Sequence, residues 1–441
     1  MKVPKAGWLS LGRNEKPLVF VPLKRYQKHR YPGMLPVVLG VDTPLKMAVR
    51  NESSKESSPL YTPARIKQVA EQQYKVGPFI AILTTDGGHP FHGNQYNFAD
   101  LIRTGRTMGV TVFVLTPGGL KSGESMVHGY LLDHRSSKTR WIPAKMPMPN
   151  VIYNRIPNRK SEQRKEVQEA IRKLQKTPGV HLFNPSFFDK WTLYKHLLAS
   201  EEFKSIVPDS TRLDNLRTLQ QMSAKYPILY LKPVAGKAGI GMMRITGRKQ
   251  GYELIYQSMR GKKKLTNLSL ASLWPKIQTL CQKRSYVIQQ GIPLALYRGS
   301  PFDVRMLLQK NGEGVWTFTG AGIRVAGKSA ISTHVPMGGR IENIHVVLTE
   351  VFGAQKDEVY GRIEEIGLAI ARFIEAKQLS KLGEMSIDLG VEKNGRMWFF
   401  EANAKPMKFD EPEIRSCSLR RLIQYCLYLS GYKQSSGGAV S

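Results

Sequence analysis

Cysteine is scarce in this chain of 441 residues, which contains only Cys281, Cys417 and Cys426. An odd count without the paired spacing of a zinc site excludes a disulfide scaffold and a cysteine-rich metal centre, and it suits a reducing compartment. Long apolar runs are missing too, since no stretch approaches the roughly 18 consecutive apolar residues of a membrane-spanning helix. The N-terminus lacks an apolar segment followed by a small-residue cleavage site. We therefore expect a soluble, cytoplasmic protein.

Acidic residues are also few. The chain has 34 Asp and Glu against 66 Lys and Arg, which gives a formal net charge of +32. The basic excess is spread over residues 1–75, 155–176 and 260–264, and no nucleic-acid motif or interleaved aromatic platform accompanies it. The sequence therefore predicts a solvated basic surface that associates loosely with acidic polymers, and it does not indicate a dedicated nucleic-acid groove.

The chain is long enough for two or three domains, each with its own core. An apolar strand at 79–85, a helix at 97–108 and a strand at 110–115 form a βαβ unit, which begins a parallel sheet. The polar residues of its first loop, His89, His92 and Asn94, either contact a substrate or are ordinary loop residues. We predict a small basic β-rich region at 1–76, a βαβ lobe at 77–183, a second α/β domain at 184–430 and a flexible tail at 431–441.

A predicted hairpin near the C-terminus carries the most informative side chains. Asn394-Gly395 is a strong signal for a two-residue loop between strands at 383–392 and 397–403. In that register Asp388 faces Glu401, and Ser386 faces Asn403. Directly opposed carboxylates, with Cβ atoms roughly 5 Å apart, repel each other unless a cation lies between them. The cation is either a metal, for which oxygen ligands favour Mg²⁺ or Mn²⁺, or a Lys or Arg side chain.

The same register assigns a hydrophobic face to the hairpin. Side chains alternate across a strand, so the face opposite to the carboxylates is expected to lie in the core. It collects Met385, Ile387, Leu389, Val391, Trp398, Phe400, Ala402 and Ala404.

A strand at 229–232 is followed by a glycine-rich loop that contains Gly236, Lys237, Gly239 and Gly241. Glycine lets backbone N–H groups approach phosphate oxygens, and lysine adds positive charge. The spacing imitates a P-loop, but methionines stand at 242 and 243, where a Walker motif requires Lys and then Ser or Thr. The loop is therefore a candidate phosphate-binding loop of another kind.

Two arginines are candidate catalytic residues. Phe302-Asp303-Val304-Arg305 places Asp303 and Arg305 on one face of a strand, and Arg324 follows in the next apolar segment. The planar donors of arginine match the oxygens of a transferring phosphoryl group, although a lone arginine also serves in surface salt bridges.

Taken in order, these segments resemble the ATP-grasp superfamily. The motifs at 302–305, 338–339 and 400–403 look like those of glutathione-synthetase-type ligases. The segments 288–294 and 383–406 are similar to the YheC/YheD family of endospore-coat-associated ATP-grasp proteins. The resemblance implies an α+β fold in which a βαβ lobe precedes a two-lobed ATP-grasp domain.

The resemblance also implies a ligand set. ATP would bind with Mg²⁺ or Mn²⁺, the metal would be held by Asp388, Glu401 and Asn403, and the glycine loop would close over the phosphates. Arg305 and Arg324 would act on the transferring phosphate. The α- and β-phosphates would contact Lys190 and Lys232, and the backbone near Gln290 and Ile292 would read adenine.

The reaction implied is ATP-dependent ligation of a carboxylate to an amine through an acyl phosphate, with an unidentified substrate. Two other functions stay open. One is a nucleotide-binding structural protein of the spore coat with little turnover. The other is a protein that binds acidic polymers through its +32 charge and uses ATP only for regulation.

Overall fold

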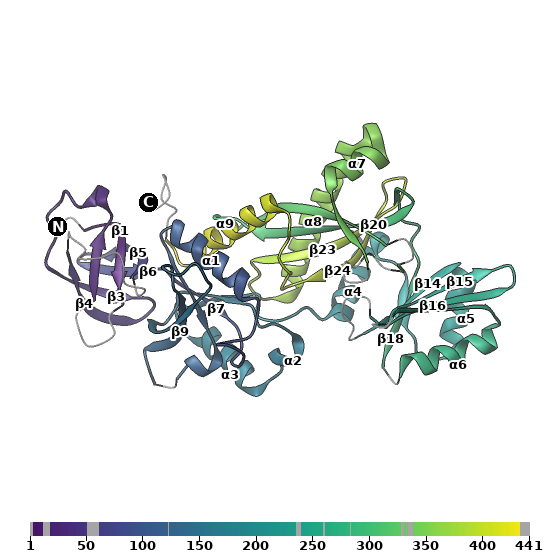
Figure 1. Cartoon of the computed structure of the whole chain (residues 1–441), viewed down its shortest axis with the longest axis horizontal. Coiled ribbons are helices and arrows are strands. Elements are labelled where there is room, and N and C mark those ends of the chain that lie inside the picture. Colours follow the sequence, from purple (N-terminus) through teal and green to yellow (C-terminus); the bar gives the residue numbers. More distant parts are fainter. Residues whose placement is uncertain are drawn as a thin grey trace.

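The computed structural model describes residues 3–11, 18–50, 61–121, 123–234, 240–258, 261–282, 284–327, 330–331, 333 and 338–432. Gly236, Lys237 and Gly239 of the predicted phosphate loop lie outside these residues. The molecule is elongated, with a β-barrel at one end and three sheets following it along the long axis (Figure 1). In the described part of the chain, no helix has the length and apolar character needed to cross a membrane.

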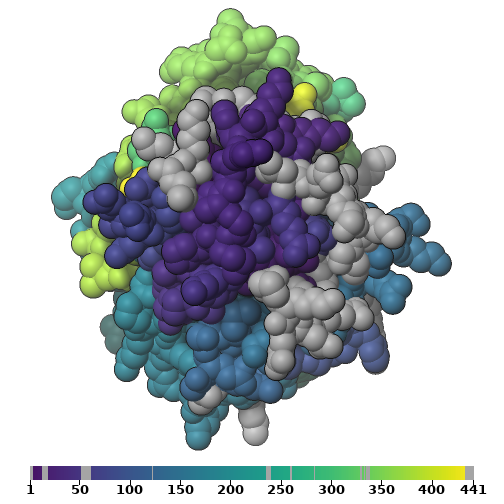
Figure 2. Space-filling model, turned by 90° about the vertical axis from the view of Figure 1, so that its left-hand side faces the viewer, coloured from purple at the N-terminus to yellow at the C-terminus, as the bar shows by residue number. Residues whose placement is uncertain are grey.

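The barrel closes in the order β1-β2-β4-β3-β6-β5. Side chains alternate between its interior and the solvent, so Leu35 and Val37 are buried while Met34 and Pro36 are exposed. Figure 2 looks onto this end of the molecule. The strands are β1 (Ala6–Ser10), β2 (Val19–Pro22), β3 (Met34–Leu39), β4 (Thr43–Val49), β5 (Tyr61–Ala70) and β6 (Gln73–Gly77), with the short helix η1 (Lys24–Tyr26) after β2.

The next sheet, called the β7 sheet, has the order β10-β9-β8-β7-β11-β12, with parallel pairing among β7, β8, β11 and β12. All residues of β7 and β8 are buried, because both faces of the sheet are covered. The barrel and α3 pack on one face, and α1 and α9 pack on the other. The elements are β7 (Phe79–Leu83), α1 (Gln95–Thr107), β8 (Thr111–Leu115), β9 (Met126–Leu132), β10 (Trp141–Pro147), β11 (Val151–Asn154), α2 (Arg159–Glu162), α3 (Lys165–Lys176), β12 (His181–Phe183) and α9 (Pro412–Leu429).

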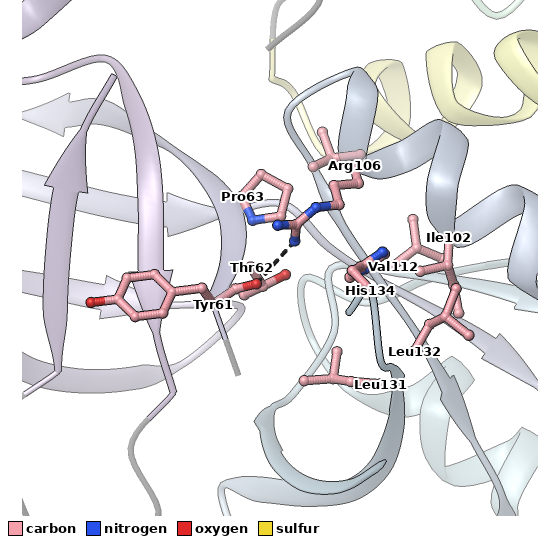
Figure 3. A pocket seen from close by; sticks show the side chains of 10 residues that line it. Tyr61, Thr62, Pro63, Ile102, Arg106, Val112, Leu131, Leu132 and His134 are labelled. Atoms are coloured by element: carbon pink, nitrogen blue, oxygen red, sulfur yellow. Dashed lines mark hydrogen bonds between the residues drawn. The ribbon is translucent and has the colours of Figure 1, made fainter. Parts of the chain in front are cut away.

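Two cations of β5 join the barrel to the ends of two helices. Arg65 donates to the carbonyl oxygen of Met108 at 2.6 Å, at the end of α1, and Lys67 donates to that of Ser430 at 3.1 Å, at the end of α9. Positive charge is favourable at a helix C-terminus, where unpaired carbonyls point outward. Beside this joint, Arg106 reaches the carbonyl of Tyr61 across a cavity of about 10 Å³ (Figure 3). That volume holds no more than a water molecule, so the cavity is too small to be a ligand site.

The remaining chain forms two further sheets. The β14 sheet has the order β13-β18-β14-β15-β16-β17, and the β20 sheet has the order β22-β21-β20-β23-β24 with β19 on β20. The first consists of β13 (Ser210–Arg212), β14 (Ile228–Pro233), β15 (Met243–Arg248), β16 (Gly251–Ser258), β17 (Gly261–Leu268) and β18 (Tyr286–Gln290), with α5 (Leu216–Lys225) and α6 (Leu270–Cys281). The second consists of β19 (Leu296–Tyr297), β20 (Ser300–Lys310), β21 (Trp316–Val325), β22 (Arg340–Asn343), β23 (Glu384–Val391) and β24 (Met397–Asn403), with α4 (Lys190–Leu198), α7 (Ile344–Phe352) and α8 (Lys356–Gln378).

One face of the β20 sheet is apolar and the other is polar. Val304, Met306 and Leu308 of β20 share a core with α8. Gly367 of α8 lies so close to Met306 that a Cβ there would be 2.2 Å from its sulfur. The long helix therefore seals the apolar face, and the side chains of the opposite face are left for chemistry.

A buried polar network attaches the β7 sheet to the β20 sheet. Tyr153 donates to Glu384 Oε1, and Arg155 Nη1 lies 3.2 Å from the same oxygen. Gln309 donates to Glu384 Oε2 at 3.2 Å, and Arg155 Nη2 donates to the carbonyl of Pro406 at 2.9 Å. A buried charge pair with all its hydrogen bonds made fixes the relative position of the elements that supply it.

Replacing Glu384 by alanine should lower the free energy of unfolding by about 3–5 kcal/mol, because the guanidinium of Arg155 would stay buried without its carboxylate. The side chains of the pair are 5% and 13% exposed. Glu350→Ala is the matched control, since Glu350 pairs with Arg298 on the surface and its loss should change little. Urea unfolding followed by tryptophan fluorescence measures both. Equal losses in the two variants would contradict the assigned role of the buried network.

Candidate functional site

The hairpin of β23 and β24 pairs Asp388 with Glu401 and Ser386 with Asn403, which confirms the predicted facing residues. The predicted two-residue loop is wrong. Glu392 and Arg396 close the turn through a 2.9 Å hydrogen bond, so three residues, 393–395, form the loop, and Gly395 takes a left-handed φ of 78°. A β-bulge between Asp388 and Leu389 takes up the extra residue and restores the register at Asp388.

The bulge changes which side chains of β24 enter the core. Beyond it Leu389 pairs with Phe399, so Met397 and Phe399 lie in the core cluster. The core positions predicted for Trp398 and Phe400 are therefore wrong. Trp398 is buried on the other face, where its Nε1 donates to Glu392 at 2.6 Å. Phe400 is half-buried, and its ring centroid lies 5.6 Å from Lys232 Nζ.

A row of charged side chains crosses the polar face of the β20 sheet. Arg305 of β20 pairs in register with Asp388, and Asp388 pairs with Glu401. Arg324 Nη1 lies 3.2 Å from Asp388 Oδ2, and Arg305 Nη1 lies 3.8 Å from the same atom. Both candidate arginines therefore lie beside Asp388, which the sequence predicts to be a metal ligand. The arginine neutralisation that the sequence left open as an alternative is present at Asp388.

Glu401 is held from two sides. Lys190, the first residue of α4, places Nζ 2.5 Å from Glu401 Oε2. Asn403 donates from Nδ2 to Glu401 Oε1 at 2.8 Å. Lys190 follows the N-cap residue Asp189, whose carboxylate accepts from the backbone of Thr192, so the start of α4 is fixed. Lys190, Glu401 and Asn403 therefore form one connected group at the end of β24.

Lys232 approaches this group from the β14 sheet. It lies near the end of β14 and donates to Gln289 Oε1 on β18. Burial lowers the pKa of Lys232 to about 8; Glu401 opposes that shift, and the nearby charge of Lys190 adds to it. Lys232 Nζ also lies 5.6 Å from the ring centroid of Phe400, the residue before Glu401, so the end of β14 lies close to the charged end of β24.

The other nucleotide-binding candidates lie on the β14 sheet or just after it. Gly241, the described end of the glycine loop, has a φ of 82°, and its carbonyl accepts from the hydroxyl of Tyr286 at 2.9 Å. Gln290 ends β18 and exchanges backbone and side-chain hydrogen bonds with Asp209. Ile292 follows in the connection to the β20 sheet and accepts from the backbone of Leu294 at 3.0 Å.

Asp303 is a member of the site to which sequence reasoning gave no role. It lies on the same face as Arg305, and Thr333 donates to its Oδ2. Its Oδ1 is buried and has no hydrogen-bond partner among the described residues. Burial first and then the nearby Asp388 raise the pKa of Asp303 to about 7. The signal in the sequence was its spacing of two from Arg305, which places both on one strand face.

The donor set fits a hard cation. Asp303, Asp388, Glu401 and Asn403 offer carboxylate and amide oxygens, which Mg²⁺ and Mn²⁺ prefer. Within the described ranges no three His, Cys, Asp or Glu side chains are gathered closely enough to hold a metal by themselves. Mg²⁺ usually binds through one or two carboxylates together with substrate phosphates, so such a group is not required for a nucleotide-bound ion.

Glu411 is a second residue that sequence reasoning missed. Gly322 pairs in register with Arg305, and a Cβ at Gly322 would lie 2.0 Å from Glu411 Oε1. Glycine therefore lets this carboxylate rest on the sheet beside Arg305. Glu411 directly precedes α9, and Arg415 of α9 pairs with Asp100 of α1, so Glu411 sits where the β7 sheet meets the charged row.

The predicted substrate-contacting loop after β7 has a partly structural role. Asn94 is the N-cap of α1, and its side chain accepts from the backbone of Asn97 at 3.1 Å. His92 donates its backbone N–H to the carbonyl of Thr85 at 3.0 Å. His89 is exposed.

Comparison with known proteins places this site in a family. The family model for YheC/D like ATP-grasp proteins matches residues 179–429, which is more than half of the chain. The endospore coat-associated protein YheD of Bacillus subtilis (strain 168) is 28% identical over 363 residues, covering 80% of this chain and 78% of that protein. The endospore coat-associated protein YheC of the same organism is 21% identical over 338 residues, covering 74% and 89%.

Solved structures are similar at lower identity. The ATP-grasp ligase PsnB, complexed with a minimal precursor, is 14% identical with a TM-score of 0.47, and 80% of this chain and 99% of that chain are covered. D-alanyl-alanine synthetase A from Vibrio cholerae O1 biovar eltor str. N16961 is 12% identical with a TM-score of 0.45, covering 80% and 98%. The chain has the α+β ATP-grasp fold, and it belongs to the YheC/D like ATP-grasp family.

Proposed function

We propose that the protein binds ATP with Mg²⁺ or Mn²⁺ and ligates a carboxylate to an amine through an acyl phosphate. The observation that carries the proposal is the convergence of Lys190, Lys232, Arg305 and Arg324 on Asp388 and Glu401 between two sheets. Phosphoryl transfer depends on positioning and charge neutralisation, and this set supplies both without a side-chain nucleophile.

Each residue has a place in this proposal. Lys190 and Lys232 bind the α- and β-phosphates, the glycine loop with Gly236, Lys237, Gly239 and Gly241 covers them, and the backbone near Gln290 and Ile292 contacts adenine. Asp388, Glu401 and Asn403 hold the metal, which when bound neutralises phosphate charge. Lys190 and Arg324 are now paired with these carboxylates and are placed to exchange them for phosphate oxygens.

The reaction has two balanced steps. An oxygen of the substrate carboxylate attacks the γ-phosphorus, the bond to the β-phosphate oxygen breaks, and ADP leaves. The amine then attacks the acyl carbon of the acyl phosphate, and inorganic phosphate leaves with the bonding electrons. Arg305 and Arg324 stabilise the charge on the transferring phosphoryl group. Glu411, beside Arg305, is the carboxylate placed to accept the proton that the amine loses.

The affinity for ATP should fall as the pH rises through about 8, because Lys232 loses its proton there and a neutral amine attracts phosphate poorly. The loss should approach about tenfold per pH unit above that point. Lys232→Ala should bind weakly at every pH. Lys232→Arg is the control, since its side chain keeps the charge and the affinity should stay flat. Calorimetric titration over a pH series tests this. A wild-type profile as flat as that of the arginine variant would remove Lys232 from the phosphate site.

Asp388→Asn should spare ATP binding without magnesium and abolish its enhancement by magnesium. The carboxylate acts through the metal, and without it Arg305 and Arg324 are left to meet the phosphates directly. Glu392→Gln on the same hairpin is the matched control, because Glu392 contacts Trp398 away from the row. Titrations of ATP with and without Mg²⁺ compare the variants. If Asp388→Asn keeps the wild-type magnesium effect, the metal is held elsewhere.

ADP formation should be slow with ATP alone and should rise when the right carboxylate is supplied. Substrate binding closes the site and excludes water, so uncoupled hydrolysis stays low. Screening amino acids, short peptides and envelope precursors for stimulated ADP release, with Glu401→Gln as the blank, measures this dependence. If the protein binds Mg-ATP yet no carboxylate raises turnover above that blank, it is a nucleotide-binding structural protein and the ligase proposal is wrong.

A further inference from the structure

The end of the barrel that carries η1 is strongly basic. From Leu18 to Val41 the sequence contains no acidic residue. The exposed cations of this end, which we call the basic barrel end, are Lys24, Arg25, Lys28, Arg30, Lys46 and Arg50. Among the described residues none of the six belongs to an ion pair. This surface carries an excess of positive charge, which an acidic partner would neutralise.

Strand directions place these cations together. β2 runs parallel to β4, and β3 runs antiparallel to β4, so the end of β2, the start of β3 and the end of β4 lie at one end of the barrel. Backbone hydrogen bonds from Arg50 to Phe20 and from Val49 to Gly33 close this end. η1 is attached to it by the bond from the backbone N–H of Leu23 to the carbonyl of Ala6 at 3.1 Å.

The positive charge of this end also acts on Arg65, at the joint between the barrel and α1. The pKa of Arg65 is lowered, first by its burial and then by the positive charge of Arg25. Of the described acids of the barrel, Asp42 is in the turn between β3 and β4 at the opposite end. Glu71 is at the tip of the β5–β6 hairpin, and because β6 runs parallel to β3, this tip lies at the same end as the start of β3. One described acid therefore stands against six cations, and the basic barrel end keeps an excess of positive charge.

Apolar side chains lie beside the cations. Met34 is 46% exposed at the start of β3, and Pro36 is exposed two residues further along the same outward face, opposite Lys46. A mixture of methionine, arginine and apolar surface is typical of protein-binding patches. An extended nucleic acid would need exposed aromatic rings for stacking, and in the described part of the barrel Tyr26 and Tyr31 are half-buried, with Tyr31 bonded to the carbonyl of Tyr26 at 2.7 Å.

We infer that the basic barrel end docks an acidic polypeptide segment whose carboxylates meet the cations and whose apolar side chains cover Met34 and Pro36. The barrel is closed, so the partner adds no strand to its edge and binds through side chains. This surface is at the end of the molecule remote from the β14 sheet (Figures 1 and 2). Docking is therefore independent of the proposed ligase activity.

The test uses the full chain and a labelled peptide of alternating glutamate and leucine. Replacing Lys24, Arg25, Lys28 and Arg30 together by glutamine should weaken binding by about tenfold or more, since each exposed pair contributes modestly and four add up. The matched control removes the same number of exposed charges from the β7 sheet and α3, at Lys138, Lys145, Arg172 and Lys176. It should leave the affinity within about twofold of the wild-type value.

A second pair of variants separates a polypeptide from a phosphate polymer. Met34→Ser should weaken binding of the peptide and leave binding of single-stranded DNA unchanged. Val346→Ser, comparably exposed on α7 away from the barrel, should change neither. Mg-ATP titration of every variant shows that the fold is intact. Equal losses in the two charge variants would overturn the inference in favour of diffuse attraction. An unchanged affinity in Met34→Ser, with DNA bound as tightly as the peptide, would overturn it in favour of charge alone.

Discussion

Three carboxylates share one face of the β20 sheet, and much of the surrounding structure follows from keeping them together. Asp303, Asp388 and Glu401 would repel one another if nothing lay between them. Arg305, Arg324 and Lys190 supply the opposing charge, each from a different strand or helix. Because these cations come from β20, β21 and α4, the elements must hold their positions for the carboxylates to stay ionised. Burial and then the nearby Asp388 raise the pKa of Asp303, and the positive charge of Arg324 does not fully offset them.

The proposed Mg-ATP site requires that the cations neutralise the carboxylates only in part. A metal ion favours the ionised carboxylates, and phosphate oxygens then provide new partners for the lysines and arginines. In the proposed function the same groups would therefore pair with one another when no ligand is bound and with a nucleotide and its metal when these are bound. A fully neutralised row would bind neither well, because every new contact would first break an equally good one.

Two glycines of β21 allow the start of α9 to lie close to the row of charged side chains. Gly320 lies under Ile414 and Gly322 lies under Glu411, and a side chain at either position would collide with them. The start of α9 can therefore rest directly on the sheet. α9 is in turn tied to α1 by Arg415 and Asp100 and to the barrel by Lys67. The barrel, the β7 sheet and the charged row are thus linked through one helix, which packs against the β7 sheet and starts at the candidate acid–base residue.

The predicted pairing of Asp388 with Glu401 is present, but it results from two departures from the predicted hairpin that cancel, a loop longer by one residue and a β-bulge. The sequence was not sufficient to predict the loop length or the bulge. With the bulge, Phe399 lies in the core cluster to which α8 also contributes, and such long-range packing cannot be predicted from local rules. Lys190 could be named only from family resemblance, since nothing near it in sequence indicates Glu401, 211 positions away.

The sequence shows a large positive net charge but does not show what the basic residues do in the fold. The basic residues behind the net charge of +32 have at least three separate roles in the fold. Some cations oppose the carboxylates of the site, and others, such as Arg65 and Lys67, bind the carbonyl ends of helices. Others, at the basic barrel end, form no ion pair among the described residues. Cations of the second kind are satisfied by folding, so they say nothing about partners. Cations that are satisfied inside the fold do not add to the surface that meets other molecules, which is why composition alone overstates the basic surface available for binding and cannot locate it.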